Sequence, residues 1–133
     1  MKDLWLRELQ GTFVWIRIKA ETLILIVRKK MEKVVIDGKV AVLVSSGFGA
    51  GWSTWNYQYP EMLFDPTIVK MLDEGKSQDE ILAYCEVKYP EGYFGGIDDL
   101  TVHWLPVGTH FRIHEYDGSE SLEIREDMHW EVA

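Results

Sequence analysis

Short runs of apolar residues, separated by turn residues, predict a small set of strands in this chain. Residues 39–45 are apolar on both faces, which is typical of a strand in the centre of a sheet. Asp37-Gly38 stands between this run and the β-rich run before it, and such a pair is the strongest short hairpin signal. Further strands are expected at about 99–105 and, from alternating apolar and polar side chains, at 14–19.

Two helices are predicted between residues 65 and 89. Asp65 is a suitable N-cap, Pro66 occupies the first helical position and Gly75 closes the first helix. Ser77 opens the second helix with capping-box spacing. The apolar side chains of the two helices fall on one face of each helix: Ile68, Val69, Leu72, Ile81, Leu82 and Cys85. We therefore interpret Cys85 as a core residue rather than a nucleophile.

A second hairpin is predicted near the C-terminus, with its turn at Asp117-Gly118. A two-residue turn places Arg112 opposite Glu123 and Phe111 opposite Ile124. Because side chains alternate across a strand, the apolar pairs face inward and the other face is polar. That polar face displays His110, Arg112, His114, Tyr116, Ser121, Glu123 and Arg125. A short terminal strand from His129 to Val132 is expected to pair at an edge.

Together these elements predict an α+β domain. We expect an antiparallel or mixed sheet built from two hairpins, with a two-helix insertion packed on one face. Residues 31–133 form this single domain. Residues 1–30 fit poorly with it, and two interpretations stay open: Met31 is the natural start, or residues 1–30 form a basic N-terminal arm or strand.

Charge and composition narrow the class of protein. The 133 residues carry a formal net charge of −8; residues 1–30 hold seven Lys or Arg against three acids, so 31–133 carry −12. Such an acidic body repels nucleic acid phosphates, and we expect no nucleic acid partner. No apolar run is long enough to span a bilayer, so no membrane partner is expected. A single cysteine is typical of the reducing cytoplasm.

The most unusual stretch runs from Ser45 to Asn56. Three glycines (Gly47, Gly49 and Gly51) alternate directly before Trp52 and Trp55. Glycine lets a ligand or another part of the backbone come close, and tryptophan offers a large flat face. This stretch is either a ligand site or a glycine-rich bulge with two tryptophans that fill the core. Its spacing matches neither the dinucleotide fingerprint nor a Walker loop.

No reaction centre or cofactor site stands out. The serines of the glycine stretch lack the nucleophile-elbow pattern. His110 and His114 share a strand face but lie roughly 13 Å apart at strand rise, too far to chelate one ion alone. We therefore expect a non-enzymatic protein without a metal or cofactor.

One part of the chain resembles a known group of proteins. Gly47-Phe-Gly-Ala-Gly-Trp-Ser-Thr-Trp-Asn56, with Phe64-Asp65-Pro66 and the ending Glu115-Tyr-Asp-Gly-Ser-Glu-Ser121, is similar to small bacteriophage and prophage proteins. The likeness covers about residues 31–133. It implies an early or accessory protein that acts on host machinery, including as a counter-defence protein. Some proteins of that class sequester nucleotide second messengers in pockets lined by aromatic residues and arginines.

The first functional hypothesis is a phage-type accessory protein that captures a small phosphorylated ligand, such as a nucleotide signal. Aromatic rings would stack on the base and cationic side chains would hold the phosphate. The candidate ligand-binding residues are Gly47, Phe48, Gly49, Gly51, Trp52, Ser53, Trp55, Asn56, Phe94, Arg112, His114 and Arg125, with Tyr57 as a further stacking residue. The alternative for the cationic strand face is a solvated surface in which Arg112 pairs with Glu123.

Two other classes of function stay open. An acidic inhibitor would dock on a basic host protein through carboxylates: Glu61, Asp98, Asp99, Glu120 and Glu123. An enzyme would use His110 or His114 as a general base. The sheet-edge hairpin can also mediate homo-oligomerisation.

Overall fold

The computed structural model describes residues 3–6, 16–19 and 31–133, and the chain divides into two compact units, Met1–Met31 and Glu32–Ala133. In the first unit, β1 (Asp3–Leu6) pairs antiparallel with β2 (Ile16–Lys19), and Leu4 lies opposite Ile18. The strand predicted near the N-terminus is therefore confirmed over Ile16–Lys19. The other two predicted positions, 14 and 15, lie outside the described residues.

The second unit is built on a three-stranded antiparallel sheet in the order β3 (Val35–Ile36), β4 (Lys39–Ser45) and β5 (Leu100–Pro106). Asp37 and Gly38 have φ angles of +51° and +74°, as a type I′ hairpin turn requires. Residues 41–44 are buried because β4 is central and is covered on both faces. The predicted first hairpin and the central position of its second strand are confirmed.

The second hairpin consists of β6 (Phe111–Tyr116) and β7 (Ser119–Ile124). Its register is the predicted one, with Arg112 opposite Glu123 and Phe111 opposite Ile124. The hairpin forms a sheet of its own, so the described strands of the second unit make two sheets rather than a single one. The physical reason is that its half-buried apolar side chains face the molecule, and β7 packs against β4 instead of extending the ladder.

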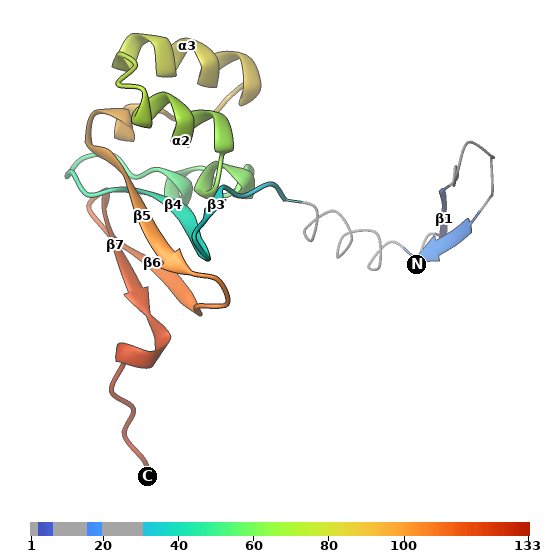
Figure 1. The fold of residues 1–133 in the computed structure, drawn as a ribbon, viewed down its shortest axis with the longest axis vertical. Coiled ribbons are helices and arrows are strands. Elements are labelled where there is room, and N and C mark those ends of the chain that lie inside the picture. The colour runs from blue at the N-terminus through green and yellow to red at the C-terminus, as the bar shows by residue number, and fades with distance from the viewer. Residues whose placement is uncertain (1–2, 7–15, 20–30) are drawn as a thin grey trace. The chain divides into compact units, whose positions relative to one another are not determined.

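The two predicted helices are confirmed as α2 (Pro66–Asp73) and α3 (Gln78–Lys88), which lie together above the strands in Figure 1. Asp65 and Ser77 are their N-caps, and Gly75 adopts a positive φ of +71° after α2. Their buried side chains share one core with the sheet and the first tryptophan of the glycine stretch, a cluster that includes Ala41, Leu43, Trp52, Ile68, Val69, Ile81 and Cys85. The α+β class is therefore confirmed. No helix among the described residues is long and apolar enough to cross a membrane.

Four short 3₁₀ turns connect these elements: η1 (Ser53–Trp55), η2 (Pro60–Leu63), η3 (Gly95–Asp99) and η4 (Arg125–Asp127). The prediction of a terminal strand over 129–132 is wrong, because these residues have no regular structure. The 3₁₀ turn η4 follows β7 at once and carries the chain out of the ladder. Met128 and Trp130 lie beside the open end of the β6–β7 hairpin, where they line a pocket with residues of both strands.

Candidate functional site

The glycine–tryptophan stretch folds around a buried carboxylate, that of Glu120, whose residue is only 2% exposed. One oxygen accepts the backbone N–H of Ser45 (3.0 Å), and the other accepts those of Trp52 (2.8 Å) and Thr54 (3.1 Å). The Thr54 hydroxyl donates to the same second oxygen at 2.5 Å. Burial of a carboxylate is costly unless such donors replace water. Glu120 therefore fixes the backbone from the end of β4 through η1.

Sequence analysis placed Glu120 among surface carboxylates for docking on a basic protein, and the structure corrects this. The alternation of side chains along β7 already indicated that Glu120 is buried. Glu120 lies on the inward face of the hairpin together with Leu122 and Ile124. Glu123, another carboxylate of that set, is engaged by Arg112. Of the five carboxylate residues proposed for docking, only Asp98 and Asp99 are exposed.

Trp52 lies in the core and offers no ring face to a ligand. It is 0% exposed, its Nε1 donates to the carbonyl of Met62 at 2.8 Å, and Phe94 packs against it with ring centroids 6.3 Å apart. Phe94 is itself half-buried. The expected stacking role of Trp52 is therefore replaced by a core role. For Trp52, the alternative in which the tryptophans of the stretch fill the core is the one that holds.

Trp55 is different, since it is 38% exposed and lies against Tyr93, with ring centroids 5.3 Å apart. Its Nε1 donates to Oε1 of Glu115 at 3.1 Å. That same oxygen accepts the backbone N–H of Gly118 at 2.6 Å, and this bond, together with that from Trp55, lowers the pKa of the Glu115 carboxyl. Two further candidates, Phe48 and Tyr57, are 73% and 88% exposed.

The glycines of the stretch allow close contacts within the protein. A Cβ on Gly47 would lie 1.8 Å from Oδ2 of Asp99, and one on Gly51 would lie 2.6 Å from Oγ1 of Thr54. The N–H of Gly49 donates to the carbonyl of Asp117 at 2.7 Å, so the hairpin turn is bound to the stretch. The space that the glycines leave is occupied by this chain's own atoms at Gly47 and Gly51.

Asn56 and Ser53 complete the stretch. The buried Asn56 amide donates to the carbonyls of Trp52 (2.7 Å) and Tyr93 (2.8 Å). Its oxygen accepts the N–H of Tyr93 at 2.7 Å, so the side chain bridges two loops. The carbonyl of Ser53 accepts the N–H of Asn56 at 3.2 Å. The buried Asn56 amide is thus occupied by the protein itself.

Two glycines offer a matched test of this packing. Gly38 and Gly118 are the second residues of Asp-Gly turns, with φ angles of +74° and +83°. A Cβ on Gly38 meets nothing within 4 Å, whereas one on Gly118 would lie 2.3 Å from the backbone nitrogen of Ala50. We expect Gly38→Ala to destabilise the protein by about 1 kcal/mol through backbone strain alone. Gly118→Ala should lower the free energy of unfolding by about 2 kcal/mol more.

Urea denaturation of both variants measures this difference. If the free energy of unfolding fell equally in the two variants, the hairpin turn would not pack closely against the glycine stretch. A larger loss for Gly118→Ala would locate the contact at Ala50.

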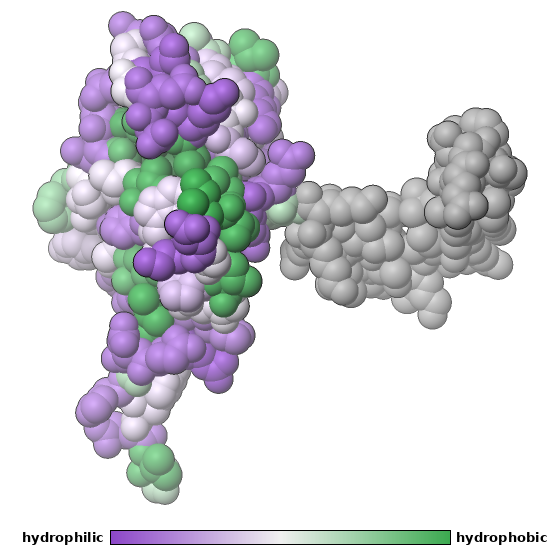
Figure 2. All heavy atoms as spheres, in the orientation of Figure 1, coloured by the Kyte–Doolittle hydropathy of each residue, from purple (hydrophilic) through white to green (hydrophobic). Residues whose placement is uncertain are grey.

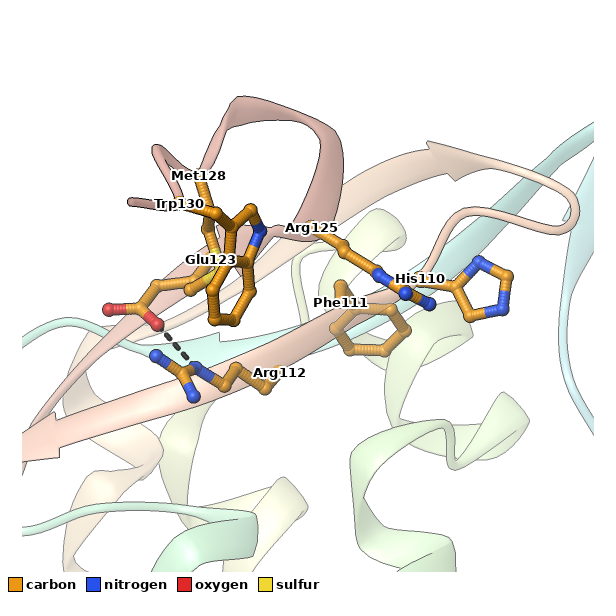
Figure 3. Close-up of a pocket in the computed structure, with 7 residues that line it drawn as sticks. All are labelled: His110, Phe111, Arg112, Glu123, Arg125, Met128 and Trp130. Atoms are coloured by element: carbon orange, nitrogen blue, oxygen red, sulfur yellow. Dashed lines mark hydrogen bonds and ion pairs between the residues drawn. The ribbon is translucent and has the colours of Figure 1, made fainter. Parts of the chain in front are cut away.

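A pocket of about 330 Å³ lies at the open end of the β6–β7 hairpin (Figure 3). It is lined by His110, Phe111, Arg112, Glu123, Arg125, Met128 and Trp130. The backbone N–H of Arg125 donates to the carbonyl of His110 at 2.9 Å, which holds these two residues together. Nε of Arg112 donates to Oε2 of Glu123 at 2.5 Å. Figure 3 shows the Arg125 guanidinium beside the His110 ring, and the Trp130 ring above the Arg112–Glu123 pair.

The structure thus divides the predicted ligand-binding residues between two places. Arg112 and Arg125 line the hairpin pocket, whereas His114 and the predicted residues of the glycine stretch do not. The reason is topological, because the glycine stretch is bound to the turn of the hairpin and the pocket lies at its open end. Each strand of the hairpin is six residues long, which separates the two ends by roughly 17 Å. Trp130 and Met128 were missed as pocket residues because the tail was predicted to be a strand.

Other chemistry has little support in the described part of the chain. No three His, Cys, Asp or Glu side chains of the described residues gather so that they could hold a metal ion. Cys85 is 0% exposed, and burial raises the pKa of its thiol to about 12, which keeps the thiol protonated and unreactive. The interpretation of Cys85 as a core residue is confirmed.

Comparison of the chain with protein-family models, curated proteins and solved structures finds no match. The function is therefore inferred from the residues themselves.

Proposed function

We propose that this protein binds a small phosphorylated ligand of the nucleotide class in the hairpin pocket, and acts as a phage-type accessory protein that captures it. The observation that supports this proposal is the meeting of two arginines, a histidine and an exposed tryptophan around one cavity. In a chain of net charge −8, the charged residues that line this cavity have one positive charge in excess.

Arg125 supplies the anion-binding half of the pocket. It forms no ion pair with any residue that the structure describes, and its backbone is held by His110. Arg112 uses Nε for Glu123, and its terminal nitrogens donate to no described side chain. Guanidinium groups with free N–H donors match the planar geometry of phosphate oxygens. Both arginines can therefore donate to a phosphate without breaking an existing pair.

Trp130 supplies the stacking half. Its residue is 71% exposed, and it stands beside the arginine pair rather than in the core. Stacking of a base on an aromatic side chain contributes about 1–3 kcal/mol. A cavity of about 330 Å³ accepts a ring or a phosphate group with the rest of the ligand in solvent. Trp130 thus takes the role that the sequence assigned to Trp52.

Calorimetric titration with ATP, a cyclic dinucleotide and inorganic triphosphate tests the proposal. Arg125→Ala should weaken the binding of every probe by roughly ten-fold, because it removes charge-assisted hydrogen bonds. Trp130→Ala should weaken the nucleotides but not inorganic triphosphate. His114→Ala is the matched control, since His114 is exposed on β6 and does not line the pocket.

Two results would contradict the proposal. The first is that neither nucleotides nor triphosphate bind to the full chain. The second is that affinity for all probes is the same in Arg125→Ala as in the unaltered protein.

A further inference from the structure

Within the second unit, β5 is an edge strand whose outer side pairs with no other described strand. Among the described strands it pairs with β4 alone, in seven consecutive residue pairs from Leu100 to Pro106. Between Thr101 and Leu105, no backbone hydrogen bond joins this outer side to another described residue. A strand of seven residues presents roughly 23 Å of edge.

The outer edge of β5 lacks the features that protect natural edges. Such edges usually carry charged side chains, an interior proline or a bulge. β5 contains no Asp, Glu, Lys or Arg, and its only proline is the last residue, Pro106. Its ladder with β4 is continuous, and Trp104 is 40% exposed. These properties suit the addition of another strand.

We propose that β5 pairs with β5 of a second copy of this chain, antiparallel about a two-fold axis at His103. This register is the one that pairs all seven residues of both strands. It places Val102 opposite the partner's Trp104, on the face that also carries Leu100. The resulting dimer has a continuous six-stranded sheet with an isologous interface.

β5 is an uncharged strand in an acidic chain. Two chains of net charge −8 repel one another over most of their surface, so an uncharged strand is where they can approach. The carboxylates nearest to β5 along the sequence are those of Asp98 and Asp99, directly before Leu100. In the proposed register they lie opposite the partner's Gly108 and Val107. No carboxylate of this segment therefore faces another.

An apolar groove of about 580 Å³ adjoins the same edge, between the sheet and α2. Trp104 and Val102 form its border on β5, and Ile36, which is 54% exposed, lies across the sheet on β3. Figure 2 shows apolar side chains gathered on this face of the molecule, below the helices. Pairing of two β5 strands would join the two grooves and cover the exposed ring of Trp104.

The proposal is tested on the full chain by native mass spectrometry and by sedimentation over a range of concentrations. We expect a dimer. His103→Glu and His103→Lys should each raise the dimer dissociation constant roughly ten-fold or more, because like charges meet at the axis. An equimolar mixture of the two variants should restore a dimer of mixed mass.

His114→Glu is the control, because it introduces the same charge at an exposed histidine outside β5. Amide hydrogen exchange gives a second measurement, in which the β5 amides should become protected as concentration rises. The proposal is overturned by a monomer at all concentrations. A dimer that is insensitive to both His103 variants would also overturn it, since it would use another surface.

Discussion

Glu120→Ala is expected to lower the free energy of unfolding by about 4 kcal/mol, the largest effect of any single substitution considered for this protein. The variant leaves three backbone N–H groups and the Thr54 hydroxyl without their acceptor, in a region where Trp52 is 0% exposed. A loss of this size is a large part of the total stability of a small domain. Chemical denaturation, followed by tryptophan fluorescence, measures it.

Two companion variants separate the role of the Glu120 carboxylate from that of the hairpin. Glu120→Gln keeps one acceptor but turns an amide NH₂ toward protein donors, so we expect an intermediate loss. Glu115→Ala is the matched control, because Glu115 lies directly opposite Glu120 on the same face of the hairpin but is far less buried. Similar losses for Glu115→Ala and Glu120→Ala would show that the carboxylate does not organise the glycine stretch.

Asp65→Ala is expected to destabilise the protein by about 3 kcal/mol. Oδ1 of this buried residue accepts the N–H groups of Thr67 (2.9 Å) and Ile68 (3.2 Å) at the start of α2. Its carboxylate also accepts hydrogen bonds from the hydroxyls of Tyr84 and Tyr89. Burial, together with the hydrogen bond to Asp65, raises the pKa of the Tyr89 phenol. The substitution therefore removes a helix cap and a link between α2 and α3.

Ser77→Ala provides the comparison for Asp65→Ala, because both residues are N-caps in the same chain. Ser77 is exposed and accepts only the N–H of Glu80, at 3.2 Å, so its loss should lower stability by about 1 kcal/mol. Thermal and urea unfolding of the two variants should differ by about 2 kcal/mol. If the two losses were equal, Asp65 would act as a cap alone, without the tyrosine network.

Much of the fold could be predicted because its signals are local. Asp37-Gly38 and Asp117-Gly118 specify type I′ turns through their own backbone preferences, and all four residues have positive φ angles. Once each turn is set, the register of its hairpin follows residue by residue. The caps of α2 and α3 are local in the same way, since each involves residues within one helical turn. The prediction of a terminal strand was wrong because no turn residue specifies a partner strand for residues 129–132.

The candidate site could be predicted only in part. The cationic pair Arg112 and Arg125 follows from strand alternation, and both arginines do line one pocket. The sequence singles out the glycine stretch, but the group that organises its backbone is this protein's own Glu120, 66 to 75 residues further along the chain. A sequence pattern does not reveal whether a close approach is made by a ligand or by another part of the same chain.

The amino-acid sequence by itself determined the α+β class, the two helices, the two hairpins and the inward or outward side of most strand positions. Each of these depends on preferences that act over a few residues. Only the tertiary structure decided that Trp52 is a core residue, that Glu120 is buried, and that Trp130 joins the arginines at a pocket. These outcomes depend on which surfaces meet across long separations in the chain, and the free energy that selects them comes from packing and from the pairing of buried polar groups.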